Sequence, residues 1–179
     1  PSNAELAYDP QSGVTNLLLT VQGSSDIYML NLENKYWNIG DLGAVPSDIG
    51  VDETTAQSVF VFSGTSKAVV LDHSQLATLN SSSLEDIDLE EPSNKALMGD
   101  GFALLYNDAS GAVHDVYKLE LESRQLTEYV VSNPVQELMV TESGRYAVAV
   151  VRPENSYGSD YQDSRYGLSI LDLSSDESI

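Results

Sequence analysis

Residues 134–151 have the sequence PVQELMVTESGRYAVAVV: a proline, a short strand-like run, a polar turn with glycine, and an apolar run. Three other stretches have the same order, and each also begins with a proline. They are PSNAELAYDPQSGVTNLLLTV from Pro1, PSDIGVDETTAQSVFVF from Pro46 and PSNKALMGDGFALLY from Pro92. The chain therefore contains four copies of one unit, spaced 45, 46 and 42 residues apart.

Each unit divides into short strand-like runs that are separated by turn residues. In the first unit the runs are AELAYD, TNLLLTVQ, DIYMLNL and YWNIGDL, with Gly, Ser, Asn and Asp between them. This pattern is typical of an antiparallel meander, and it lacks the sustained 3.6-residue apolar period of a helix. Strand-like repeats of about 40–50 residues predict the blades of a β-propeller.

The sequence thus predicts an all-β fold, a propeller segment of four antiparallel four-stranded blades whose last blade is incomplete. The predicted blades are 1–45, 46–91, 92–133 and 134–179. After Asp172 only LSSDESI follows, so the outermost strand of the fourth unit is expected to be missing. Open ends promote association. We expect about half of a seven- or eight-bladed propeller; the alternatives are two copies that complete a ring, and a four-bladed ring that lacks its last strand.

The second and third strands carry further signals. The second strand of every unit is apolar nearly throughout, as at 59–62 and 147–150, which predicts burial on both faces between neighbouring blades. The third strands share a polar residue at their end, at Asn31, Asp72, Glu120 and Asp172. We predict that these four side chains serve the turns that follow rather than function.

Three features together resemble the YVTN and WD40-like family of bacterial β-propeller repeats. They are the proline before the first strand, the acidic or Ser-Gly turn before the second (DPQSG, TESG, GDG), and the third strand that ends in LDL or a similar sequence. The resemblance covers the whole chain. It implies the propeller fold and assigns neither an activity nor a role to any residue.

The composition excludes several classes of function. The 28 acidic and 8 basic residues give a net charge of −20, which repels a phosphate backbone, so we expect no nucleic acid partner. No segment approaches the ~20 apolar residues of a membrane helix, so no membrane insertion is expected. Cysteine is absent, which excludes disulfides, thiolate catalysis and Cys-ligated zinc. The compartment stays open, with a periplasmic or extracellular location favoured.

One loop breaks the regular pattern. Between the second and third strands of the fourth unit lies the insertion PENSYGSDYQDSRYG, residues 153–167, where the other units have short turns. Long structured loops are often functional, and tyrosine and arginine are frequent in contact hot spots. We therefore predict a binding surface formed by Arg152, Tyr157, Asp160, Tyr161, Asp163, Arg165 and Tyr166. A mobile polar loop is the alternative.

Catalytic and metal signatures are weak. The sequence contains no GxSxG elbow, HExxH pair or Walker loop. His73 and His114 are not at equivalent repeat positions, so we expect ordinary surface or edge histidines, and we expect Glu90 and Glu91 to be exposed. No cofactor or metal is predicted, since the acidic and amide residues of the insertion match no EF-hand or RTX spacing. A calcium site there would use Asn155, Asp160 and Asp163.

These observations favour a non-catalytic binding or scaffold module that contacts a protein or glycan through its loop face. The alternative is part of a propeller enzyme, lactonase-like or glycan-processing, with a site at the central channel that needs further blades. A third interpretation is a spacer in a larger extracellular or periplasmic assembly. Self-association, or the remaining blades of a longer chain, would cover the open ends.

Overall fold

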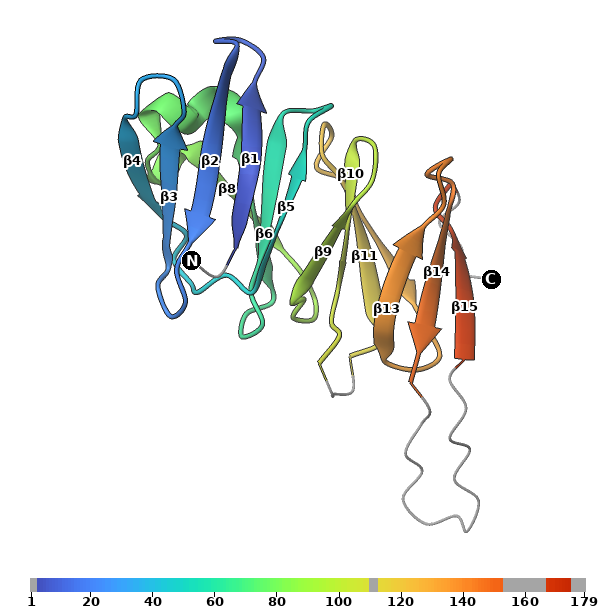
Figure 1. Cartoon of the computed structure of the whole chain (residues 1–179). Helices are drawn as coiled ribbons and strands as arrows, with labels where there is room; N and C mark the ends of the chain where they lie inside the picture. Colours follow the sequence, from blue (N-terminus) through green and yellow to red (C-terminus); the bar gives the residue numbers. More distant parts are fainter. Residues whose placement is uncertain (1–2, 110–112, 153–166, 175–179) are drawn as a thin grey trace.

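A computed structural model of the chain describes residues 3–109, 113–152 and 167–174 (Figure 1). Within these ranges the protein consists of antiparallel strands, with two short 3-10 helices between β7 and β8. None of the described helices is long and apolar enough to cross a membrane.

The strands form four sheets, and each sheet comes from one of the four sequence units. The first contains β1 (Ala4–Asp9), β2 (Val14–Thr20), β3 (Asp26–Asn31) and β4 (Trp37–Asp41). The second contains β5 (Asp48–Asp52), β6 (Gln57–Val61), β7 (Lys67–Asp72) and β8 (Leu84–Asp88). The third contains β9 (Lys95–Met98), β10 (Phe102–Tyr106), β11 (Asp115–Glu120) and β12 (Leu126–Val130). The fourth contains β13 (Val135–Val140), β14 (Tyr146–Val151) and β15 (Gly167–Asp172).

The four sheets are the blades of a β-propeller. In every sheet the strands follow their order in the chain, and the first strands β1, β5, β9 and β13 lie side by side across Figure 1. We call the sheets blades 1 to 4. The predicted all-β propeller is confirmed, and the fourth blade has three strands within the described residues.

Blade packing explains a difference from the predicted burial of the second strands. All five residues of β6 and all five of β10 are buried, as predicted. In β2 and β14 buried positions alternate with half-buried ones, so the prediction is wrong for blades 1 and 4. The reason is physical: each of these two blades has a described neighbour on one face only.

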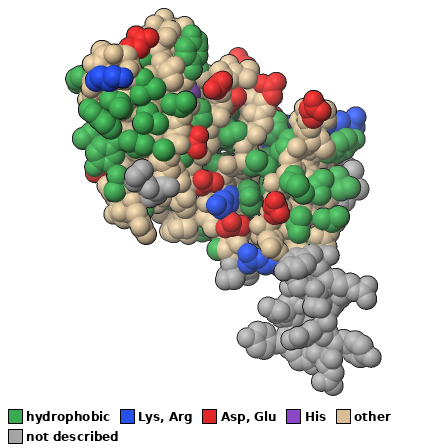
Figure 2. Space-filling model, viewed as in Figure 1, with side chains coloured by type: hydrophobic (Ala, Val, Ile, Leu, Met, Phe, Trp, Pro, Cys, Tyr) green, Lys and Arg blue, Asp and Glu red, His purple; other side chains and the backbone are tan. Residues whose placement is uncertain are grey.

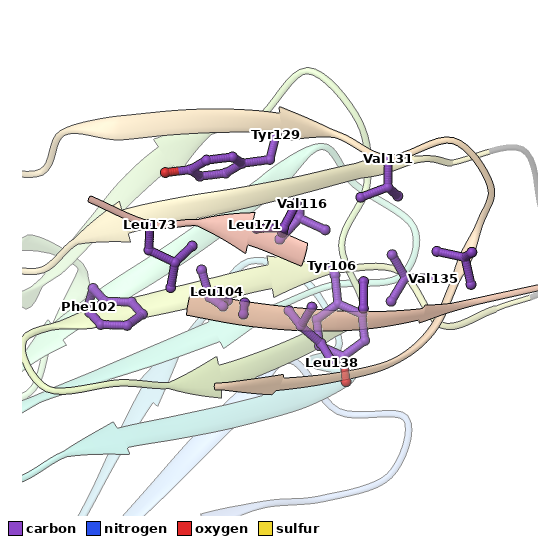
Figure 3. Close-up of a cluster of buried hydrophobic side chains, with 13 residues drawn as sticks. Phe102, Leu104, Tyr106, Val116, Tyr129, Val131, Val135, Leu138, Leu171 and Leu173 are labelled. Atoms are coloured by element: carbon purple, nitrogen blue, oxygen red, sulfur yellow. The ribbon is translucent and has the colours of Figure 1, made fainter. Parts of the chain in front are cut away.

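The core lies between the blades and consists of three apolar clusters. One cluster lies between blades 1 and 2 and includes Phe60 and Leu71. A second lies between blades 2 and 3 and includes Val59 and Leu105. The third joins blades 3 and 4 (Figure 3), where Tyr129 is 2% exposed. Burying each large apolar side chain contributes about 1.5–3 kcal/mol, so face-to-face packing of blades stabilises the fold.

The polar residues at the ends of the third strands act mainly on turns. Asn31, Asp72 and Asp172 each accept backbone amide hydrogen bonds from the residues that follow, at 2.8–3.1 Å. These bonds satisfy amides that the sheet leaves unpaired, which confirms the prediction for three of the four. Glu120 differs, because its carboxylate pairs with Lys118.

The helices η1 (His73–Thr78) and η2 (Ser81–Ser83) are a difference from the sequence analysis, which predicted strands alone. Asp72 precedes η1 and accepts a hydrogen bond from the amide of Ser74 at 2.8 Å. Asn80 precedes η2 and accepts one from the amide of Ser82. Asp and Asn are strong N-cap residues, so the polar stretch between β7 and β8 held a signal for helix starts.

His73 is completely buried, so its prediction as a surface or edge residue is wrong. Its Nδ1 lies 2.8 Å from the carbonyl oxygen of Tyr8 in blade 1, and its Nε2 lies 2.9 Å from Oγ of Ser58 in blade 2. Because a carbonyl only accepts, Nδ1 carries the proton and Nε2 accepts from the Ser58 hydroxyl. A neutral His73 therefore ties the first two blades together. Burial lowers its pKa, against the opposing effect of the Tyr8 carbonyl.

Replacing His73 with glutamine should lower the free energy of unfolding at pH 8 by about 2 kcal/mol, because buried hydrogen-bonding groups lose their partners. Since the pKa of His73 is lowered on folding from its ordinary 6.5, the unfolded chain takes up the proton first. The stability contributed by His73 is thus complete above pH 6.5 and declines as the pH falls below it. Urea unfolding from pH 8 to 5 should show the deficit of His73→Gln shrinking.

His114 supplies the matched control. It is half-buried, with Nδ1 3.3 Å from the carbonyl of Val131. His114→Gln should stay within about 0.5 kcal/mol of the native protein at pH 8. A deficit for His73→Gln that is constant over the whole pH range would show that His73 does not stay neutral in the folded protein.

Candidate functional site

Of the seven predicted binding residues, only Arg152 lies within the described part of the chain. Its guanidinium donates a hydrogen bond to the carbonyl of Asp108, in the loop that follows β10 of blade 3. Arg152 thus fastens the end of β14 to the neighbouring blade. The six other predicted residues lie outside the described ranges, as does Asn155 of the calcium alternative: Tyr157, Asp160, Tyr161, Asp163, Arg165 and Tyr166.

The loop that receives Arg152 is braced by further hydrogen bonds. The carboxylate of Asp108 accepts from the Asn94 amide at 2.8 Å, and the Asp108 backbone amide donates to the Asn94 side chain at 2.9 Å. Lys95 Nζ lies 3.9 Å from the same carboxylate. These contacts brace the loop within blade 3, and the Arg152 hydrogen bond joins it to blade 4.

A cleft of about 570 Å³ opens at the other end of the strands, between blades 3 and 4. Its walls are the turn between β9 and β10, the ends of β10 and β11, and the turn between β13 and β14. The lining residues are Met98, Gly99, Asp100, Phe102, Lys118, Glu120, Val140, Thr141, Glu142, Ser143 and Gly144. We call this the blade 3–4 cleft. It lies at the end of the strands opposite the loops that join the second and third strands, and those loops form the predicted loop face.

Lys118 is the central charged group of the cleft. Its Nζ lies 2.6 Å from Oε1 of Glu120 and donates to the carbonyl of Leu173 in blade 4 at 2.9 Å. The ammonium also lies 5.2 Å from the centre of the Phe102 ring, within the range of a cation–π contact. Only 15% of the side chain is exposed, so Lys118 is held in place and links blade 3 to blade 4.

The rim of the cleft is polar and acidic. Asp100 and Glu142 are exposed, and the hydroxyls of Thr141 and Ser143 lie 3.2 Å apart. Together with Glu120, the lining of the cleft carries three carboxylates and one ammonium, that of Lys118. The resulting negative potential attracts positively charged groups.

At the same end of the strands as the cleft, a histidine, an arginine or a lysine reaches across each of the three blade junctions. His73 crosses from blade 2 to blade 1. From the turn after β11, Arg124 reaches blade 2, with Nε 2.7 Å from Glu85 and Nη1 2.8 Å from Gln57. Lys118 crosses the third junction, and there open space remains beside it.

The exposed pair Glu90 and Glu91 belongs to a separate acidic group at the junction of blades 2 and 3. Burial raises the pKa of Asp115, and Glu91 and Glu90 raise it further. Burial likewise raises the pKa of Glu128, with added repulsion from Asp115. Among the described residues, no group of three or more His, Cys, Asp or Glu could hold a metal ion. These carboxylates lie outside the lining of the cleft.

Sequence reasoning missed the cleft, although two signals were present. In the aligned third strands, Lys118 stands where the other units have Met29, Val70 and Ile170. The turn that precedes β10 is Gly99-Asp100-Gly101, and a Cβ on Gly99 would lie 2.2 Å from Cζ of Phe102. Lys118 is thus a charged residue at a position that is apolar in the other units, and it lies beside a turn with two glycines. These two departures from the repeat coincide with the blade 3–4 cleft.

No protein-family model matches the sequence, and no curated protein matches it either. Solved structures of β-propeller proteins share its fold at low identity. Hydrazine synthase from Kuenenia stuttgartiensis is 12% identical, with a TM-score of 0.68 over 94% of this chain and 50% of that one. TolB from Acinetobacter baumannii is 12% identical, with a TM-score of 0.54 over 96% of this chain and 41% of that one.

A putative 6-phosphogluconolactonase from Bacteroides uniformis is 11% identical, with a TM-score of 0.57 over 99% of this chain and 54% of that one. The chain thus spans about half the length of these proteins or less. At such identities the likeness shows the fold alone. Proteins with unrelated names share this fold, so the function of this chain depends on its site and not on the fold.

Gly99→Ala should destabilise the protein by about 1–3 kcal/mol, because the new methyl group would overlap the Phe102 ring. Gly64 is the matched control, since a Cβ there would meet nothing within 4 Å, and Gly64→Ala should be nearly neutral. Urea unfolding measures both. Equal effects of the two substitutions would contradict the close packing of the turn against the ring.

Asp115→Asn should raise the free energy of unfolding at pH 7. Because folding raises the pKa of Asp115 above its ordinary 3.8, the charged form opposes folding, and this cost disappears as the pH falls through the folded pKa. The gain of Asp115→Asn should therefore vanish near pH 3. Asp88→Asn, at an exposed position of β8, controls for the loss of one negative charge. A gain no larger than that of Asp88→Asn would contradict this assignment.

Proposed function

We propose that the protein is a non-catalytic binding module whose blade 3–4 cleft receives a positively charged segment of a protein partner. The observation that carries the proposal is the cleft itself: open space beside a fixed Lys118–Glu120 pair, with exposed carboxylates on its rim.

The size and lining of the cleft support this function. Its volume of about 570 Å³ falls in the range of sites that hold small ligands or a few side chains. Met98 and Val140 give apolar contact surface, and Asp100, Glu120 and Glu142 give negative charge. A lysine or arginine side chain of a partner offers both an apolar stem and a cationic head. A neutral glycan offers no charge to these carboxylates, so a protein partner is favoured.

The order of the site also supports binding. Lys118 has three partners, and the Gly99 turn is packed against Phe102. A site whose groups are already held in place loses little conformational entropy when a partner binds.

The proposal extends to the family and to the other face of the molecule. Membership of the YVTN and WD40-like repeats, with blades at 1–45, 46–91, 92–133 and 134–179, is supported by the proline and turn pattern. Arg152 and the insertion that follows it stay a predicted second contact surface. The enzyme alternative requires side chains that converge at the central channel, and no contact among the described residues specifically favours it.

The test compares variants against one set of peptides, selected from a displayed random library on the native protein. The cleft variant is Asp100→Lys with Glu142→Lys. The matched control is Glu33→Lys with Glu53→Lys, which makes the same change of charge at exposed residues of other blades. Selected peptides should be rich in lysine or arginine, and fluorescence anisotropy should show at least about tenfold weaker binding to the cleft variant.

The control variant should retain most of its affinity. Equal losses in both variants would show that only the overall negative charge matters and would contradict a site in the cleft. A chain that lacks residues 154–166 tests the predicted second surface. If this deletion abolishes binding and the cleft variant does not, the insertion replaces the cleft as the binding site.

A further inference from the structure

The face of blade 1 that points away from blade 2 is apolar and uncovered in the described part of the chain. Leu6 is 53% exposed, Trp37 49% and Ile39 55%. The strand register places these side chains on one surface with their cross-strand neighbours. This blade 1 end face has Leu6, Leu17, Leu19, Leu30, Trp37 and Ile39 at its centre and the polar Asp26 and Asp41 at one edge. Figure 2 shows hydrophobic side chains gathered over this blade.

Blade 4 has a corresponding apolar face on the side away from blade 3. Leu168 is 72% exposed and Ile170 51%. The register pairs Met139 with Val148, Val148 with Ile170, and Val150 with Leu168, so these side chains share one surface. The blade 4 end face comprises Met139, Val148, Val150, Leu168 and Ile170, with the exposed Glu137 paired with Val150 at its β13 edge.

The two end faces correspond to the two sides of the internal blade junctions. Ile170 is equivalent to Met29 and Val70, each 1% exposed and each packed against the next blade. Leu30 of the blade 1 end face is equivalent to Leu71, which is fully buried against the preceding blade. A blade 4 end face is therefore built to pack against a blade 1 end face.

We propose that two copies of the chain close a ring through these faces, with blade 4 of each copy stacked on blade 1 of the other. A head-to-tail contact of this kind closes on itself when each copy spans half of the circle. The chain covers 50%, 41% and 54% of the length of the three propeller proteins named above, so two copies supply about as much chain as one such protein.

The contact area is sufficient for a stable dimer. Strands about 4.8 Å apart and roughly 17–20 Å long give a three-stranded face a footprint of about 240–290 Å² and a four-stranded face one of about 330–380 Å². The three-stranded blade 4 face limits each contact, so two contacts with two faces each bury on the order of 1,000–1,150 Å² if the faces are treated as flat, which clears the ~1,000 Å² expected of a specific interface. The centres of both faces carry apolar side chains, whereas each copy carries a net charge of −20. Added salt should therefore strengthen the association.

The first measurement is the mass of the purified chain in solution by light scattering, over a range of concentrations. We expect a species of twice the 19.4 kDa of one chain. Trp37 is the sole tryptophan and lies in the blade 1 end face, so dilution should shift its fluorescence to the red as the dimer separates. A monomer at all concentrations would overturn the proposal and leave the faces to further blades of a longer chain. Growth into open-ended assemblies would also overturn it.

Two variants test the pairing. Leu6→Lys changes only the blade 1 end face, and Ile170→Lys changes only the blade 4 end face. Because every head-to-tail contact uses one face of each kind, each variant alone should dimerise roughly 100-fold more weakly, since an apolar contact offers a lysine no partner. If only one of the two variants separates the dimer, like faces pair and the proposal is wrong.

Mixing the two variants provides a positive result. A mixed pair contains one contact between two native faces, so association should partly return when Leu6→Lys and Ile170→Lys chains are combined. Val130→Lys is the control, because Val130 is 59% exposed on β12, outside both end faces, and should leave the dimer unchanged. No recovery in the mixture, or loss of the dimer in the control, would overturn the proposal.

Discussion

The contact between neighbouring apolar sheet faces is the interaction on which the rest of the structure depends. A single four-stranded sheet has two faces to bury, and each blade buries one face only by supplying a surface for the next. This explains the full burial of β6 and β10, the alternation in β2 and β14, and the location of the core between sheets. The site and the end faces both arise where this stacking is interrupted.

Much of the fold could be predicted from the sequence, because it follows from a pattern that repeats. Four prolines at regular spacing, turn residues and apolar runs identified four antiparallel units, and the structure contains them. The predictions were wrong where the burial of a residue depends on parts of the chain that are distant in sequence. Burial of a second strand depends on whether a neighbouring blade exists, and the burial of His73 depends on Tyr8, 65 residues away in the chain. Local sequence carries neither fact.

The candidate site was much harder to predict than the fold. The long insertion breaks the repeat, and of the seven predicted contact residues Arg152 lies within the described part of the chain. The blade 3–4 cleft depends on a smaller departure, a lysine in a row of apolar residues beside a glycine turn. Lys118 is recognisable as central only when Glu120, Leu173 and Phe102 are seen around it. The spacing of the repeat predicts the order of the strands, but it does not predict which side chains contact one another between blades.

Amide hydrogen exchange, measured at two protein concentrations, tests the stacking account most directly. If blade faces are stabilised by the blade beside them, β6 and β10 should be the most protected strands at both concentrations. Protection of β2 and β14 should rise with concentration as their open faces become covered. Protection that is the same in all four second strands, or highest in β2 and β14 at low concentration, would contradict the dependence of each blade on its neighbours.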